Sequence, residues 1–149
     1  MAKIFDVEKY RKEIIGFFEQ AMDSGRIDAV MMPMQVPSKD SYAWIVTTDK
    51  SMLKQMNPIA PIMPINGANA LKRYTRKGKA ELNLAVVLRP CEIRASIDLM
   101  KLKQVNAEKV FLFSFDCVGA VPMQDYIVDA ENKEKQFIEI LVHEFVDTP

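Results

Sequence analysis

The chain has few of the residues that build metal centres and disulfide frameworks, with two cysteines and one histidine in 149 residues. The two cysteines form no Cys-x-x-Cys pair, and they are too few for a disulfide framework. No apolar run approaches the roughly 18 residues of a membrane span, and charged residues interrupt the start where a signal peptide would have its apolar core. Gly-x-Gly-x-x-Gly, Walker, Gly-x-Ser-x-Gly and His-Glu-x-x-His motifs are missing. These absences predict a cytoplasmic protein without a membrane span.

An excess of positive charge is also missing, because the formal net charge is zero, and this argues against a nucleic-acid binder. The charge is unevenly spread: residues 1–115 hold 18 Lys and Arg against 12 Asp and Glu, and residues 116–149 hold 2 against 8. Within the fold, the negative charge of residues 116–149 could neutralise the positive charge of residues 1–115. Alternatively, residues 1–115 could form a cationic pocket for a phosphorylated small molecule.

The first half of the chain predicts one helix and a hairpin. Apolar residues recur at helical spacing over residues 6–24, and residues 29–36 and 42–48 have the character of two strands. Pro33 suggests that the first strand lies at a sheet edge or carries a bulge. Residues 57–67 are apolar yet contain three prolines, which excludes a helix or a central strand. This segment could form the wall of a pocket or a packed connector.

The second half alternates between helical patterns and short apolar strands. The expected helices are 68–77, 90–103 and 131–146, and the expected strands are 82–88 and 110–115. Strands without polar alternation, joined by a helix, are typical of a parallel βαβ unit. With 49% hydrophobic residues, the chain can form a single core. We therefore expect residues 1–149 to form a single α/β domain, a small mixed sheet with a parallel βαβ unit flanked by helices.

The segment Arg89-Pro-Cys-Glu92 joins the first apolar strand of this unit to its helix. Pro90 suits the first helical turn, so Cys91 falls at a helix N-terminus, where the helix dipole and the flanking Arg89 and Arg94 favour a thiolate. Thiolates bind metals and attack electrophiles. This segment is the strongest candidate for chemistry in the chain.

The second cysteine, Cys117, follows the second apolar strand, and Gly119 would let the backbone come close to a ligand there. Neighbouring parallel strands lie about 4.8 Å apart, so both cysteines should emerge at one carboxyl edge, where open α/β sheets place their ligands. An isolated cysteine of this kind is more often an inert core residue. Two thiolates cannot complete a four-ligand site, so the other ligands must come from elsewhere.

Other polar residues leave more alternatives open. Glu92 and Asp116 lie beside the cysteines and could act as general acid or base, although the spacing singles out neither, and His143 is more typical of a surface residue than of a ligand. A basic stretch could grip dinucleotide phosphates beside a helix start, or could be a solvated helix face. The helix start is Asn66 and Gly67, and the stretch contains Lys72, Arg73, Arg76, Lys77 and Lys79.

Over residues 66–120 the sequence resembles the beta-subunit family of coenzyme F420-reducing hydrogenases and formate dehydrogenases. Arg89-Pro-Cys-Glu92 matches the family's strand that ends in Pro-Cys-Gln, and Phe115-Asp-Cys-Val-Gly119 matches its second cysteine. Glu92 in place of Gln is also similar to the Arg-Pro-Cys-Asp element of sulfhydrogenase and anaerobic sulfite reductase subunits. The resemblance implies a flavoprotein that binds FAD and a [4Fe-4S] cluster and exchanges electrons with a carrier such as coenzyme F420.

Carried over, the resemblance makes Cys91 and Cys117 two of four cluster ligands and places residues 66–76 near the flavin. The family's downstream Cys-x-x-Cys pair is absent, so we expect the N-terminal part of a longer redox subunit, or a small divergent relative. Partners would be other subunits of a redox complex or further copies of the chain. The expected function is electron transfer within an anaerobic oxidoreductase. The alternatives are an assembly or scaffold domain without a complete cofactor site, and a thiol enzyme that uses Cys91 as nucleophile.

Overall fold

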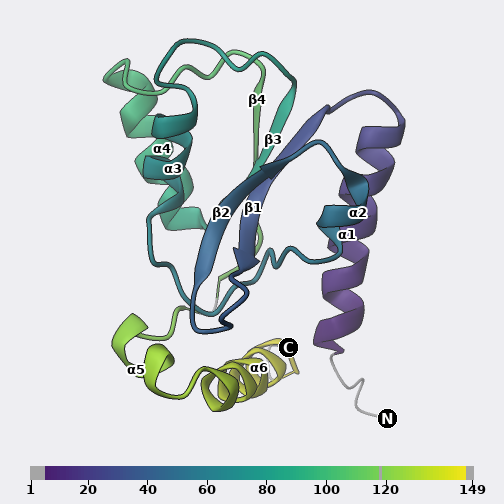
Figure 1. The fold of residues 1–149 in the computed structure, drawn as a ribbon, viewed down its shortest axis with the longest axis vertical. Coiled ribbons are helices and arrows are strands. Elements are labelled where there is room, and N and C mark those ends of the chain that lie inside the picture. The colour runs from purple at the N-terminus through teal and green to yellow at the C-terminus, as the bar shows by residue number, and fades with distance from the viewer. Residues whose placement is uncertain (1–5, 118, 147–149) are drawn as a thin grey trace.

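The computed structural model describes residues 6–117 and 119–146, which form a four-stranded sheet with helices on both faces (Figure 1). The elements in chain order are α1 (Val7–Asp23), β1 (Ala29–Gln35), β2 (Tyr42–Thr47), α2 (Lys50–Leu53), α3 (Gly67–Tyr74), β3 (Leu84–Val87), α4 (Pro90–Lys101), β4 (Val110–Phe113), α5 (Met123–Val128) and α6 (Ala130–Val146). Across these residues, no helix combines the length and apolar character that a membrane crossing requires.

The sheet is mixed, with strand order β2-β1-β3-β4. β2 pairs antiparallel with β1, while β1, β3 and β4 run parallel. Every residue of β3 is buried, which is typical of a parallel strand covered on both faces. The expected α/β fold and its β3–α4–β4 unit are confirmed.

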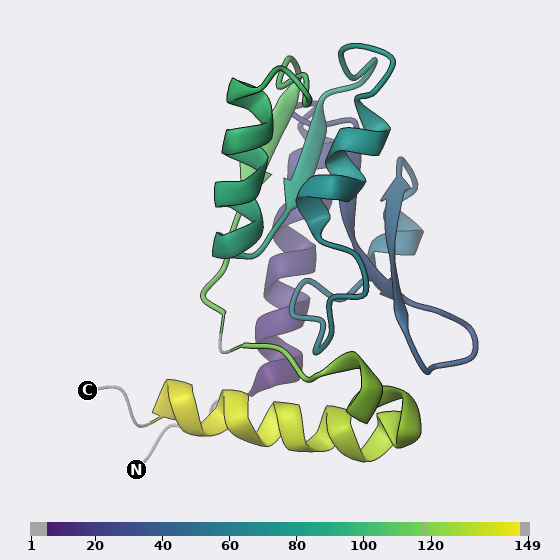
Figure 2. The same cartoon turned by 90° about the vertical axis from the view of Figure 1, so that its left-hand side faces the viewer.

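Helices cover the two faces of the sheet unequally. α1 lies on one face, where Ile14, Ile15 and Phe18 pack against Val30 and Val87. α3 and α4 cover the other face, and Figure 2 shows the sheet between these layers. Because α3 and α4 lie over β1, β3 and β4, part of β2 is left uncovered on that face, as the exposed Val46 shows.

β1 is an interior strand, so the expectation that Pro33 marks an edge strand was wrong. Pairing between β1 and β3 ends at Met31 and Val86, two residues before the proline. Beyond that point the Pro33 carbonyl accepts a hydrogen bond from the Asn57 N–H at 2.8 Å. The missing N–H of Pro33 therefore removes no hydrogen bond between these strands.

α5 and α6 lie across the end of the sheet at which β1 and β3 point (Figures 1 and 2). A hydroxyl network attaches them: Tyr42 of β2 and Tyr126 of α5 both donate to the Glu134 carboxylate of α6. Asn57 donates to the Tyr42 hydroxyl and Gln35 to that of Tyr126. The helix expected over 131–146 is thus confirmed, and its docking depends on polar contacts with β2 as well as on apolar packing.

Both tyrosines of this network should make folding sensitive to alkaline pH. Burial raises the pKa of Tyr126 to about 12, and burial together with the hydrogen bond to Glu134 raises the pKa of Tyr42. Unfolded tyrosines ionise near pH 10, so this stabilisation is complete below about pH 10 and is lost as the pH rises towards 12. Denaturant unfolding across this range should show a steeper stability loss for the wild type than for Tyr126→Phe. Parallel curves would contradict this assignment.

Candidate functional site

Both cysteines lie at the carboxyl edge of the parallel strands, as expected from the sequence. Cys91 is in the first turn of α4, directly after β3, and Cys117 follows β4. Both are exposed, and β3 pairs with β4 in parallel register. The Gly119 N–H lies 3.4 Å from the Cys117 sulfur, and Gly119 has φ of 114°, a conformation that favours glycine. The edge thus presents two accessible thiols, one of them in contact with a backbone N–H.

A complete metal site is not formed by these residues. Within 6–117 and 119–146, no group of three or more His, Cys, Asp or Glu side chains comes together in an arrangement that could hold a metal ion. An iron–sulfur cluster takes four ligands. The described part of this chain therefore cannot hold a [4Fe-4S] cluster alone. It supplies two of the thiols that such a cluster would need as ligands.

Glu92 has a structural position that the sequence did not reveal. Its side chain is only 1% exposed, and each carboxylate oxygen accepts one backbone N–H: Gly67 of α3 at 2.7 Å and Arg89 before α4 at 2.9 Å. Both N–H groups belong to helix N-termini, whose dipoles favour an anion. Glu92 therefore joins the starts of α3 and α4. With both oxygens engaged by backbone, we assign it this role instead of that of a general acid or base.

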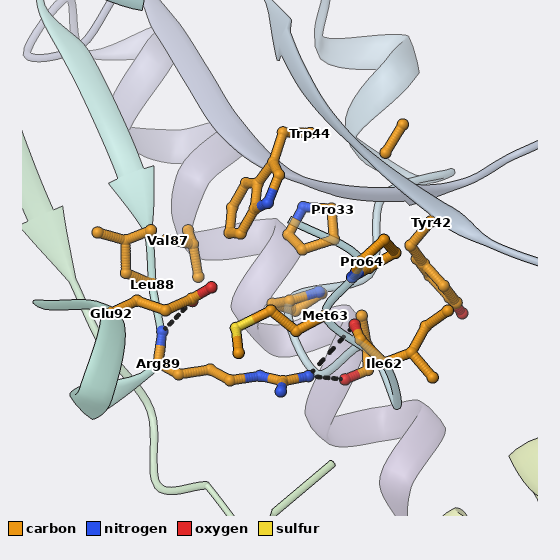
Figure 3. A pocket seen from close by; sticks show the side chains of 13 residues that line it. Pro33, Tyr42, Trp44, Ile62, Met63, Pro64, Val87, Leu88, Arg89 and Glu92 are labelled. Atoms are coloured by element: carbon orange, nitrogen blue, oxygen red, sulfur yellow. Dashed lines mark hydrogen bonds between the residues drawn. The ribbon is translucent and has the colours of Figure 1, made fainter. Parts of the chain in front are cut away.

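Arg89 connects the cysteine edge to the proline-rich segment 57–67. Its guanidinium donates to the carbonyl of Ala60 and, at 3.5 Å, to that of Ile62 (Figure 3). The same segment is held from the other side, because the Val121 N–H donates to the Pro61 carbonyl at 2.8 Å. Residues 57–67 are therefore a packed connector, and they also line the cavities at the edge.

Two cavities flank Arg89, and both are small. One, of about 20 Å³, lies between β2, the connector and the start of α4, with Trp44, Met63 and Glu92 in its wall (Figure 3). The other, of about 30 Å³, is lined by Cys117, Gly119 and residues of α6. Such volumes hold about one or two water molecules, whereas small-molecule sites measure several hundred Å³. A flavin ring does not fit either cavity.

The start of α3 differs from the expected phosphate site. The Gly67 N–H donates to Glu92, and the Ala68 N–H donates to the Asn66 side chain at 2.9 Å. Gly67 is instead required for close packing, because a Cβ there would lie 2.6 Å from the Trp44 ring and would also collide with Leu88. Asn66 and Gly67 therefore have structural roles in this arrangement, and these N–H groups are not free for an anion.

The basic stretch lies near the opposite edge of the sheet from the cysteines. Lys72 donates to Gln104 at 2.6 Å and Lys79 forms an ion pair with Glu108, both beside the loop that leads into β4. Arg73 borders a groove next to β2. Arg76 and Arg94 are exposed. The structure thus brings Arg89, Cys117 and Gly119 to one cavity and places the lysine and arginine residues of α3 elsewhere.

The comparisons with known proteins found similarity to a curated redox subunit. No family model matches the chain. It is 28% identical over 112 residues to the beta subunit of the F420-dependent formate dehydrogenase 1 of Methanococcus maripaludis. The alignment covers 73% of this chain and 27% of that protein, so the chain spans about a quarter of the curated relative's length. The resemblance expected from residues 66–120 is confirmed: the chain is similar, at a distance, to formate dehydrogenase beta subunits.

Proposed function

We propose that this chain is an electron-transfer subunit or domain of an oxidoreductase of the formate dehydrogenase beta type. The observation that carries the proposal is the pair of exposed cysteines that follow two adjacent parallel strands. The similarity to a formate dehydrogenase beta subunit supports it, since that relative is a redox subunit by name. Electron donor and acceptor would be other subunits and a carrier such as coenzyme F420.

In this proposal Cys91 and Cys117 are two thiolate ligands of an iron–sulfur cluster, and the remaining ligands come from outside the described residues. Cys91 lies in the first turn of α4 and the Gly119 N–H lies 3.4 Å from the Cys117 sulfur, and both positions would favour the negative charge of a cluster-bound sulfur. Arg89 and Arg94 add positive charge beside Cys91, which favours the reduced form of a bound redox group. When bound, the cluster would supply one-electron chemistry and FAD would exchange electron pairs.

An assembly or scaffold role is the second candidate. The observation that favours it is that the described residues do not form a metal site by themselves. A domain of this kind would keep the fold and the contact surfaces while binding no cofactor. The two candidates predict opposite contents of iron and flavin in the isolated protein.

Isolation of the tagged protein from anaerobically grown cells, together with its associated subunits, separates the two candidates. Under the proposed function, iron, acid-labile sulfide and flavin should be present, and Cys91→Ser or Cys117→Ser should lower the iron and sulfide contents by the equivalent of one cluster. Ser114→Ala, which changes an exposed residue between β4 and Cys117, should retain the iron. Colourless protein without iron or flavin would refute the electron-transfer proposal and favour the scaffold role.

A further inference from the structure

β2 lies at the edge of the sheet, and its outer side has no strand beside it. Within the described part of the chain, β2 pairs with β1 and with no other strand. The Val36 N–H donates to the Ser41 carbonyl at 3.0 Å, which makes these two residues a hydrogen-bonded pair. Because such pairs alternate along an antiparallel ladder, the N–H and C=O groups of Trp44 and Val46 point away from β1. These groups are therefore open to pairing along the sheet edge.

The residues of β2 include none of the features that usually protect a sheet edge. Exposed edge strands commonly carry a charged residue, a proline or a bulge, each of which hinders pairing with another chain. Tyr42–Thr47 contain no charged residue and no proline, and they pair with β1 in unbroken register. Val46 is 37% exposed although its side chain is apolar. β2 can therefore accept a further strand.

An open groove of about 490 Å³ lies beside this edge, between β2 and α3. We call it the β2–α3 groove. Trp44 and Val46 line it, since residues two apart in a strand share a face, and Ile65, Arg73 and Tyr74 line it as well. The two residues with open main-chain groups are thus also part of the groove wall. A segment that paired with β2 would direct every second side chain into this groove.

The lining of the groove is apolar except for the positive charge of Arg73. Ile65 and Tyr74 are exposed, and the Trp44 indole N–H donates to the Ile65 carbonyl at 2.8 Å, which fixes this part of the wall. Acidic residues are missing from the lining and from residues 67–80. Among the ion pairs within the described residues, none involves Arg73. The groove therefore complements an apolar side chain next to a carboxylate.

We propose that the β2–α3 groove binds an extended, acidic segment of a partner protein, which pairs with β2 as a fifth strand of the sheet. An aromatic or aliphatic side chain of the segment lies between β2 and Tyr74, and a carboxylate lies on Arg73, whose guanidinium can donate two parallel hydrogen bonds to it. Main-chain pairing provides affinity in this mode, and the side chains provide selectivity. The inference goes beyond the proposed function, because it assigns a protein-docking surface that depends on neither cysteine and on no cofactor.

Selection of heptapeptides from a random phage-displayed library, with the purified 149-residue chain as bait, tests the chemistry of the partner. Enriched peptides should have apolar residues at every second position and should contain Asp or Glu. The most enriched peptide is then synthesised with a fluorescent label and titrated with the chain. Arg73→Glu should weaken its binding by about 10-fold or more, because two negative charges would then face each other. Val46→Lys should weaken it by about 10-fold or more, because a lysine protects the edge.

Arg26→Glu and Phe111→Lys are the matched controls for these two variants. Arg26 is an exposed arginine in the turn between α1 and β1. Phe111 is 46% exposed and lies on β4, the strand at the opposite edge of the sheet. Both controls should leave the affinity for the peptide unchanged, and far-ultraviolet circular dichroism should confirm that every variant is folded.

Methylation of single main-chain nitrogens in the synthetic peptide tests the strand pairing itself. In a strand added to a sheet edge, the N–H groups of alternate residues point at the neighbouring strand and the others point at solvent. Methylation should therefore weaken binding by about 5-fold or more at every second position, through loss of a hydrogen bond, and have little effect at the positions between.

Four outcomes would overturn the proposal: no enrichment, enriched peptides without acidic residues, binding that is indifferent to Arg73 and Val46, or an equal response to methylation at all positions. Analytical ultracentrifugation of the chain without peptide provides a further test. Self-association that Val46→Lys abolishes would assign the groove to a second copy of the chain, and would also overturn the proposal. None of these assays requires iron, so their failure is distinct from a failure of the cysteine variants to change the iron content.

Discussion

Glu92→Ala should lower the free energy of unfolding by about 3–5 kcal/mol, a large share of the stability of a domain of this size. The substitution removes the acceptor of two buried hydrogen bonds, from the N–H groups of Gly67 and Arg89. Each unsatisfied N–H costs about 1–3 kcal/mol, and the lost side chain leaves a cavity between α3 and α4. Denaturant unfolding followed by circular dichroism measures the change.

Two further variants make this test specific. Glu92→Gln keeps one acceptor oxygen but directs an NH₂ group at the second N–H, so the loss should be intermediate, at about 2 kcal/mol. Glu13→Ala removes an exposed carboxylate from α1 and should change stability by less than about 0.5 kcal/mol. If Glu92→Ala and Glu13→Ala had equal effects, the proposed role of Glu92 in joining the two helix N-termini would be wrong.

Gly67→Ala should destabilise the fold by about 2–3 kcal/mol, although it adds a single methyl group. The new Cβ would lie 2.6 and 2.8 Å from two carbons of the Trp44 ring and would also collide with Leu88. Relief requires a shift of α3 or of the indole, and overpacking of this kind costs about 1–3 kcal/mol. The shift would also disturb the Gly67–Glu92 hydrogen bond.

Gly16→Ala is the matched control for this substitution. Gly16 lies in the middle of α1, and a Cβ there meets nothing within 4 Å. Alanine should therefore stabilise the protein by about 0.5–1 kcal/mol, because it restricts the unfolded chain and favours helix. Thermal or denaturant unfolding of both variants should give shifts of opposite sign. A neutral Gly67→Ala would show that α3 can move away from β2 at little cost.

Much of the fold follows from local sequence patterns. The buried run of β3, Pro90 at the first helical position and the apolar β4 predicted the parallel unit, because each pattern is decided within a few residues. The short helices α2 and α5 were not predicted, since four and six residues give little periodicity. The prediction that Pro33 marks an edge strand was wrong because an interior strand can hold a proline beyond the point where its neighbour stops pairing. The sequence of β1 alone does not show where its pairing with β3 ends.

The candidate site was predicted only in part, because some of its features follow from local sequence and others depend on contacts between residues far apart in the chain. Cysteines that follow two neighbouring parallel strands must lie at one edge, so the positions of Cys91 and Cys117 could be inferred from the chain order. The role of Glu92 depends on a contact with Gly67, 25 residues away, and so requires the packed structure.

If Cys91 and Cys117 bind a redox cluster, electron paramagnetic resonance of the anaerobically isolated, dithionite-reduced protein should detect it. The wild type should give an iron–sulfur signal that is lost in Cys91→Ser and in Cys117→Ser, while both variants remain folded. The signal should persist in Ser114→Ala. An iron–sulfur signal that survives both cysteine substitutions, or a wild-type protein without such a signal, would contradict this role of the two cysteines.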